Sequence, residues 1–105
     1  MITYSSSAQI KTYINGNLAH TYSGSGTIST APQDLWIGGR AAGQYFDGLI
    51  DDVRIYNTAL ADAQVAQLYN GTLISTANLA GLWHFDEGLG GDVSDSSNNG
   101  NNGTV

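Results

Sequence analysis

Acidic side chains are the first candidates for chemistry in this sequence. Because the strands expected around residues 50–56 and 82–87 can pair antiparallel, several carboxylates near their ends can converge. Converging negative charges need a partner, and a hard cation such as Ca²⁺ prefers carboxylate and backbone oxygens. One interpretation is therefore a calcium site at a loop rim. Its candidate ligands are Asp51, Asp52, Asp86, Glu87 and Asp95.

The same acids also allow a purely structural interpretation, which we favour. Asp51 can accept hydrogen bonds from backbone amides of the loop DSSNNG, residues 95–100, while the other carboxylates stay solvated. The sequence contains no EF-hand pattern, so calcium rests on the cluster of acids alone. Calcium is kept as the alternative.

Catalytic patterns are missing from the sequence. A glycosidase needs two carboxylates across a cleft, and the spacing of the acids around Asp51 does not match that arrangement. His20 and His84 do not form a metal-binding spacing, and the chain has no cysteine and no nucleophile-elbow motif. We therefore expect no catalytic residue and no enzyme activity, with both histidines as ordinary strand residues.

A hairpin is the clearest element. Two alternating runs flank Asn15-Gly16, a dipeptide that tolerates the positive φ angles of a two-residue turn. This turn predicts that Tyr13 lies opposite Leu18 and that Lys11 lies opposite His20. Neither face of the hairpin is purely polar, so we expect both faces to be at least half covered.

Further strands are expected along the chain. After a connection over residues 23–33, a short strand is predicted over 34–39, a long extended stretch over 45–56 and a strand over 82–87. Alternation in the long stretch places Asp51 in an apolar row. Trp36 and Trp83 stand inside the alternating runs and are predicted to lie in the core.

One helix is expected, around residues 61–69. The hydrophobic period changes there to about 3.6 residues, which is typical of a helix with one apolar face. Val65 and Leu68 belong to this face, and Gly71 is placed to end the helix. Its start is poorly marked, because Ala61 occupies the position of the N-cap and only Asp62 favours the positive end of the dipole.

Composition limits the partners. The chain has 105 residues, three basic residues, nine acidic residues and a formal net charge of −6. Nucleic acids and anionic membranes bind clustered Lys and Arg, so neither is an expected partner. The first ten residues do not resemble a signal peptide, and no run of 18 apolar residues occurs.

Three segments resemble one family. FDGLIDDVRIYNTALADAQVAQLYNG resembles the end of a laminin G-like domain of the concanavalin A-like superfamily, and YSSSAQIKTYINGNLAHTYSGSG resembles the hairpin before it. LAGLWHFDEGLGGDVSDSSNNGNNGTV resembles the first strand and loop of that domain. The resemblance implies an all-β antiparallel sandwich, or jelly roll, with one short helix.

The order of these segments departs from the family pattern. Residues 1–71 resemble the C-terminal half of a single domain over 1–105, whereas residues 72–105 resemble its N-terminal strand and loop. The middle strands are missing, so the chain resembles a permuted and truncated domain. In the family's fold the first and last strands are antiparallel neighbours, so we expect the strands of Arg54 and Trp83 to pair through a helical connection.

The resemblance also implies a function. It is that of a noncatalytic binding module for carbohydrate or for cell-surface and protein recognition, in an extracellular or cell-surface setting. Aromatic side chains stack on sugars and Arg donates to hydroxyls, so the expected ligand site is Arg40, Gln44 and Tyr45. The alternative is a structural, self-assembling fragment with no ligand of its own.

The missing strands predict a homo-oligomer. A single sheet exposes an apolar face that one short helix covers only in part. A second copy is the simplest cover, so we expect a half-sandwich in each chain that a homodimer completes.

Overall fold

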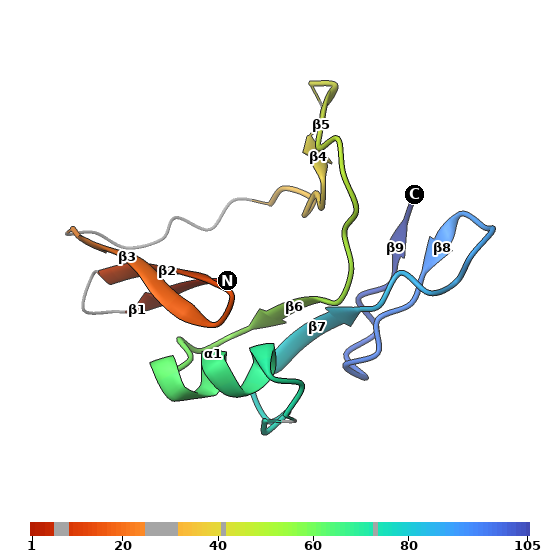
Figure 1. The fold of residues 1–105 in the computed structure, drawn as a ribbon. Helices are drawn as coiled ribbons and strands as arrows, with labels where there is room; N and C mark the ends of the chain where they lie inside the picture. Colours follow the sequence, from red (N-terminus) through yellow and green to blue (C-terminus); the bar gives the residue numbers. More distant parts are fainter. Residues whose placement is uncertain (6–8, 25–31, 41, 73) are drawn as a thin grey trace. The chain divides into compact units, whose positions relative to one another are not determined.

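The computed structural model describes residues 1–5, 9–24, 32–40, 42–72 and 74–105 (Figure 1). Antiparallel strand pairs and one short helix make up the described structure, which confirms the all-β class. Most of the connection predicted over residues 23–33 lies outside the described residues. Two compact units form, Met1–Ile28 with Ile55–Ala80 and Ser29–Arg54 with Gly81–Val105.

The first unit is built on a three-stranded antiparallel sheet in the order β1 (Ile2–Ser5), β2 (Gln9–Ile14), β3 (Asn17–Ser23). Asn15 and Gly16 join β2 to β3 with φ angles of 51° and 76°. Positive φ at both central residues is the geometry of a type I′ turn, whose twist matches that of the flanking strands. The predicted hairpin is therefore confirmed.

The predicted register of this hairpin is correct near the turn and wrong beyond it. Tyr13 pairs with Leu18, but Lys11 pairs with Thr21 instead of His20. The register shifts between Thr12 and Tyr13, because one extra residue of β3 is left unpaired as a bulge. Beyond the bulge, the residues of β3 therefore change sides relative to the prediction.

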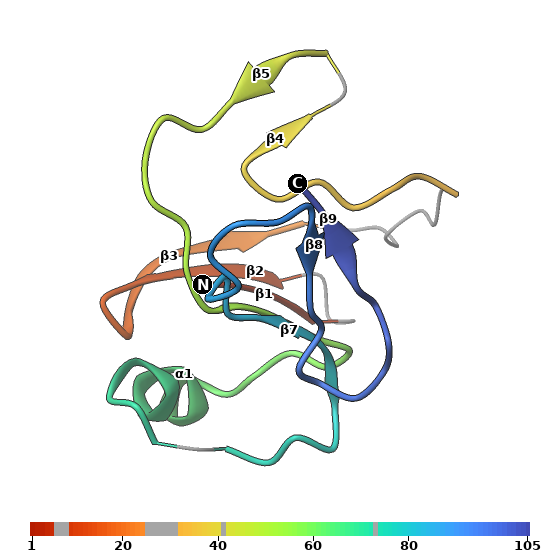
Figure 2. The ribbon, with the colours of Figure 1, turned by 90° about the vertical axis from the view of Figure 1, so that its right-hand side faces the viewer.

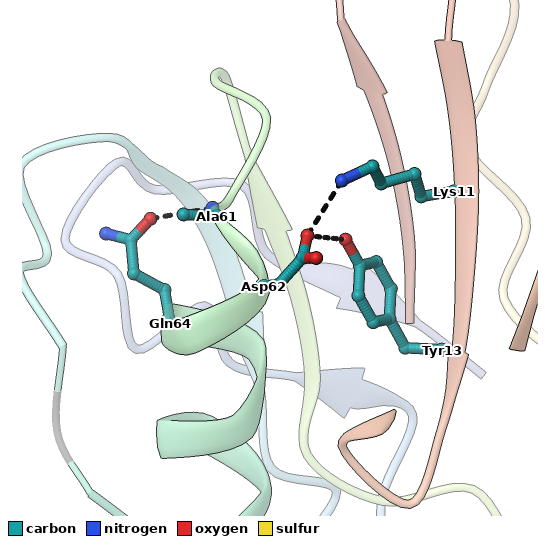
Figure 3. A network of polar contacts seen from close by, with 5 residues as sticks. All are labelled: Lys11, Tyr13, Ala61, Asp62 and Gln64. Atoms are coloured by element: carbon teal, nitrogen blue, oxygen red, sulfur yellow. Dashed lines mark hydrogen bonds and ion pairs between the residues drawn. The ribbon is translucent and has the colours of Figure 1, made fainter. Parts of the chain in front are cut away.

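Helix α1 (Asp62–Tyr69) docks on β2 through its first residue (Figure 3). Asp62 Oδ1 accepts hydrogen bonds from Lys11 Nζ at 2.8 Å and from the Tyr13 hydroxyl at 2.7 Å. The hydrogen bond from Lys11, followed by the one from Tyr13, lowers the pKa of Asp62. Ala61 occupies the N-cap as predicted, and Gln64 Oε1 accepts its backbone amide at 2.9 Å.

The other end of α1 is closed by a Schellman motif. Gly71 has a φ of 74°, and its amide donates to the Leu68 carbonyl at 3.1 Å. The Thr72 amide donates to the Gln67 carbonyl at 2.9 Å. This pair of bonds defines the motif, and it satisfies carbonyl groups that the helix leaves free. The predicted role of Gly71 is confirmed.

The core of the first unit lies between α1 and one face of the sheet. Both views show α1 beneath β1, β2 and β3 (Figures 1 and 2). Tyr13, Leu60 and Val65 are buried there. Three half-buried side chains pack against them: Tyr56, Leu68 and Ile74.

Strand β6 (Val53–Tyr56) pairs with β7 (Leu79–Trp83). Just beyond the strands, the Asn57 amide donates to the Asn78 carbonyl at 2.9 Å. This bond joins the end of β6 to the start of β7, so the two strands run antiparallel. The predicted adjacency of the Arg54 and Trp83 strands is therefore confirmed.

Both strands are shorter than the sequence predicts. The extended stretch expected over residues 45–56 is interrupted at Asp52, whose φ is 49°, and β6 begins only after it. Asp51 is exposed and does not continue an apolar row. Strand β7 begins three residues earlier than predicted and ends at Trp83, because Phe85 takes a φ of 59°.

Trp83 belongs to the second unit. Its side chain is buried, and its indole Nε1 donates to the Asn101 carbonyl at 2.9 Å. The ring covers Gly81, where a Cβ atom would collide with it. The loop that Trp83 contacts lies between β8 (Asp92–Val93) and β9 (Gly103–Thr104), which pair antiparallel. Trp36 is exposed and in no strand, so its predicted core position is wrong.

Candidate functional site

The predicted ligand residues lie on a small hairpin of the second unit. Strands β4 (Gly39–Arg40) and β5 (Gln44–Tyr45) pair antiparallel. The Gly43 amide donates to the Arg40 carbonyl at 3.0 Å, and Gly43 adopts a φ of 79° that favours glycine. All three predicted ligand residues are exposed on this hairpin.

Register divides these residues between the two faces of the hairpin. Arg40 pairs with Gln44, so their side chains lie together on one face. Tyr45 pairs with Gly39 and therefore points to the other face. Its ring lies against the backbone of Gly39, with Cδ1 3.2 Å from the place of a Cβ atom, and its side chain is 79% exposed. The structure thus presents Tyr45 as an open aromatic surface.

Phe46 supplies an aromatic ring that the predicted site lacks. Its amide donates to the Gly38 carbonyl at 2.7 Å, which continues the ladder of the hairpin by one residue. Alternation along the strand places Phe46 on the face of Gln44 and Arg40. The side chain is 62% exposed. The aromatic pair at positions 45 and 46 is visible in the sequence, but the face of each ring follows only from the register.

The acidic residues are distributed over several separate contacts. Asp52 Oδ1 lies 2.5 Å from His84 Nδ1, and its Oδ2 lies 3.4 Å from Arg54 Nη2. Because Asp52 precedes β6 and His84 follows β7, this contact links the same ends of the paired strands. Asp52 therefore has a role within the fold.

Asp95 holds its own loop together. One carboxylate oxygen accepts hydrogen bonds from the Leu82 and Ser97 amides, and the other accepts from the Ser97 hydroxyl and the Asn101 amide. Burial alone would raise the pKa of Asp95, but these hydrogen bonds outweigh it and hold the pKa well below its ordinary range. The structural role predicted for Asp51 thus belongs to Asp95.

The Glu87 carboxylate also accepts a hydrogen bond from a backbone amide. Its Oε1 accepts the Ser94 amide at 2.7 Å, and this backbone hydrogen bond lowers the pKa of Glu87. Asp51 and Asp86 are exposed. In the part of the chain that the structure describes, no three His, Cys, Asp or Glu side chains are grouped so that they could hold a metal ion. Calcium binding stays a prediction.

The comparison with known families agrees with the fold. A laminin G-like family model, described as the concanavalin A-like lectin/glucanases superfamily, matches residues 1–66. The chain therefore belongs to the laminin G-like domains of this superfamily. No curated protein and no solved structure matches the chain.

Membership in this family supplies the general class of function. Laminin G-like domains are typically noncatalytic binding modules, and they are often extracellular. Among the described residues, no helix has the length and apolar character needed to cross a membrane.

Proposed function

We propose that the chain is a noncatalytic module that binds a neutral carbohydrate at the β4–β5 hairpin. The observation that carries the proposal is the exposure of Tyr45 and Phe46 on opposite faces of this hairpin. Large aromatic side chains are usually buried, so two adjacent exposed rings favour a binding role.

The face of Phe46 offers the fuller set of contacts. The flat apolar ring can cover the C–H face of a sugar, while Arg40 and Gln44 donate hydrogen bonds to its hydroxyl groups. These two side chains are cross-strand partners, so the hairpin fixes their spacing. Tyr45 extends the contact surface to the other face of the same hairpin.

The charge of the chain favours a neutral ligand. A net charge of −6 repels sulfated or carboxylated glycans at long range, and Arg40 is the single basic residue of the hairpin. We accordingly propose neutral oligosaccharides as the ligand class and an extracellular or cell-surface setting, as is frequent in the family.

Calorimetric titration with a panel of neutral oligosaccharides tests this proposal. Phe46→Ala should weaken binding about tenfold, the effect of losing about 1.4 kcal/mol. Tyr45→Ala should weaken it as well, because it removes the other exposed ring. Leu89→Ala serves as the control, since Leu89 is fully exposed in the same unit but outside the hairpin.

Parallel titrations with Ca²⁺ and with a chelator separate the calcium prediction from the carbohydrate proposal. Binding that is lost in chelator supports a calcium site, whereas equal binding in both conditions removes calcium from the account. An oligosaccharide panel without binding in either condition would contradict the proposed function.

A further inference from the structure

Within the first unit, the face of the β1–β2–β3 sheet that points away from α1 carries several exposed apolar side chains. Helix α1 packs on the face of Tyr13, and the side chains that alternate with it point away from the helix. Ile2 is 72% exposed and Ile14 is 66% exposed. We call this surface the open face and define it by its exposed large apolar residues: Ile2, Ile10, Ile14 and Tyr22.

The register gathers these residues into one patch. Ile10 stands between Tyr4 and Tyr22, its partners on the two neighbouring strands. The bulge in β3 is what brings Tyr22 to this side, since it shifts the pairing by one residue. The same register places Thr12 and His20 on this face, so the patch also contains a hydroxyl group and an imidazole ring. An exposed patch with several large apolar side chains is typical of an interaction site.

The open face carries no Lys, Arg, Asp or Glu. Lys11 is the single such residue in the three strands, and it points to the opposite face, where it contacts Asp62. Two open faces can therefore meet without burying like charges, although each chain has a net charge of −6. An acidic or basic partner would find no charge to recognise there.

We propose that the open face is an interface between two copies of this chain. Strands β1 and β3 are the outer strands of the sheet, and each copy offers the same surface, as a two-fold dimer requires. This proposal does not rest on carbohydrate binding, because the β4–β5 hairpin belongs to the other unit.

The size of the face sets the expected affinity. Three strands spaced about 4.8 Å apart and about 20 Å long give a flat footprint of roughly 300 Å². Stable interfaces bury about 800 Å² on each partner, so this footprint is small. We therefore expect a reversible dimer with a dissociation constant in about the micromolar range or weaker, and a mass that rises with concentration.

Sedimentation equilibrium tests the interface with a matched pair of variants. Tyr22→Asp places a charge on the open face, whereas Thr21→Asp places the same charge on the neighbouring residue, which faces the other way. The wild type and Thr21→Asp should rise from 11.0 kDa toward twice that mass. Tyr22→Asp should stay at 11.0 kDa.

A second pair of variants adds no charge and therefore tests the interface even if the Asp variants fail to fold. Ile14→Thr keeps a β-branched side chain and should weaken the dimer about tenfold, while Leu18→Thr on the opposite face should not. Circular dichroism checks that each variant is folded, and Tyr45→Ala should leave the mass unchanged. A wild type that stays at 11.0 kDa at its solubility limit, or equal effects of each variant and its control, would overturn the proposal.

Discussion

Asp95 is the residue on which the C-terminal loop depends. Four hydrogen bonds from three residues converge on its two carboxylate oxygens, and one of them comes from Leu82 in β7. The carboxylate thereby ties the loop to the strand that carries Trp83. Leu82 also contributes its carbonyl, which accepts the Ser96 amide at 2.8 Å.

Asp95→Asn should destabilise the chain in a pH-dependent way. The folded pKa of Asp95 lies below that of the unfolded chain, which is about 3.9, so the stabilisation is complete above pH 4 and is lost as the pH falls toward the folded pKa. The gap in unfolding free energy between wild type and Asp95→Asn should therefore be largest near pH 7 and shrink below about pH 4.

Denaturant unfolding at several pH values measures this gap. Asp92→Asn is the control, because it removes the same charge from an exposed residue of the same unit. If both variants lose the same stability at pH 7, Asp95 does not organise the loop as described.

For individual residues, the sequence predicts the contacts of the acidic side chains only in part. The sequence shows five acids in two expected strands and a loop, all of them candidate acceptors or metal ligands. It does not show which of these carboxylates accepts hydrogen bonds from backbone amides. That choice depends on where the chain turns, and the sequence does not indicate the positive φ angles at Asp52 and Phe85. The pattern therefore indicates Asp51 for a role that Asp95 performs.

At the scale of elements, the docking of α1 on β2 depends on polar contacts as well as on apolar packing. The Tyr13 ring is buried beside Leu60 and Val65, while its hydroxyl reaches Asp62 at the start of the helix. Burial, together with the hydrogen bond to Asp62, raises the pKa of the Tyr13 hydroxyl. The hydroxyl therefore stays a donor at neutral pH.

Tyr13→Phe should reduce the free energy of unfolding by about 1 kcal/mol, the usual loss for one hydrogen bond when the ring keeps its packing. Chemical denaturation measures the loss. Tyr69→Phe is the matched control, because Tyr69 belongs to the same helix and is 60% exposed. Equal stabilities for the two variants would show that the hydroxyl of Tyr13 does not help to hold the helix.

The elements themselves were largely predictable. Asn15-Gly16 and Gly71 mark a turn and a helix end through local backbone preferences, which do not depend on the rest of the fold. The bulge in β3 and the exposed position of Trp36 depend on tertiary packing, which periodicity does not reveal. The register predicted from the sequence would place Tyr22 on the face of Tyr13, whereas the bulge places it on the face of Ile10.

At the scale of the whole molecule, the β6–β7 pair joins a segment that the family model matches to a segment beyond that match. Residues 1–66 match the family, and β6 lies inside this match, whereas β7 lies beyond it. The predicted circular permutation requires this pairing, because it returns a first strand to its usual neighbour. The pairing is confirmed, while the permutation and the single domain over residues 1–105 stay predictions.

The most direct test of this account is an NMR measurement of the β6–β7 pair in isotope-labelled protein. We expect cross-strand nuclear Overhauser contacts between the strands of Arg54 and Trp83, together with slow hydrogen exchange at the Asn57 amide, which donates to Asn78. Absence of these contacts, with residues 79–83 exchanging as fast as an unfolded chain, would contradict the account.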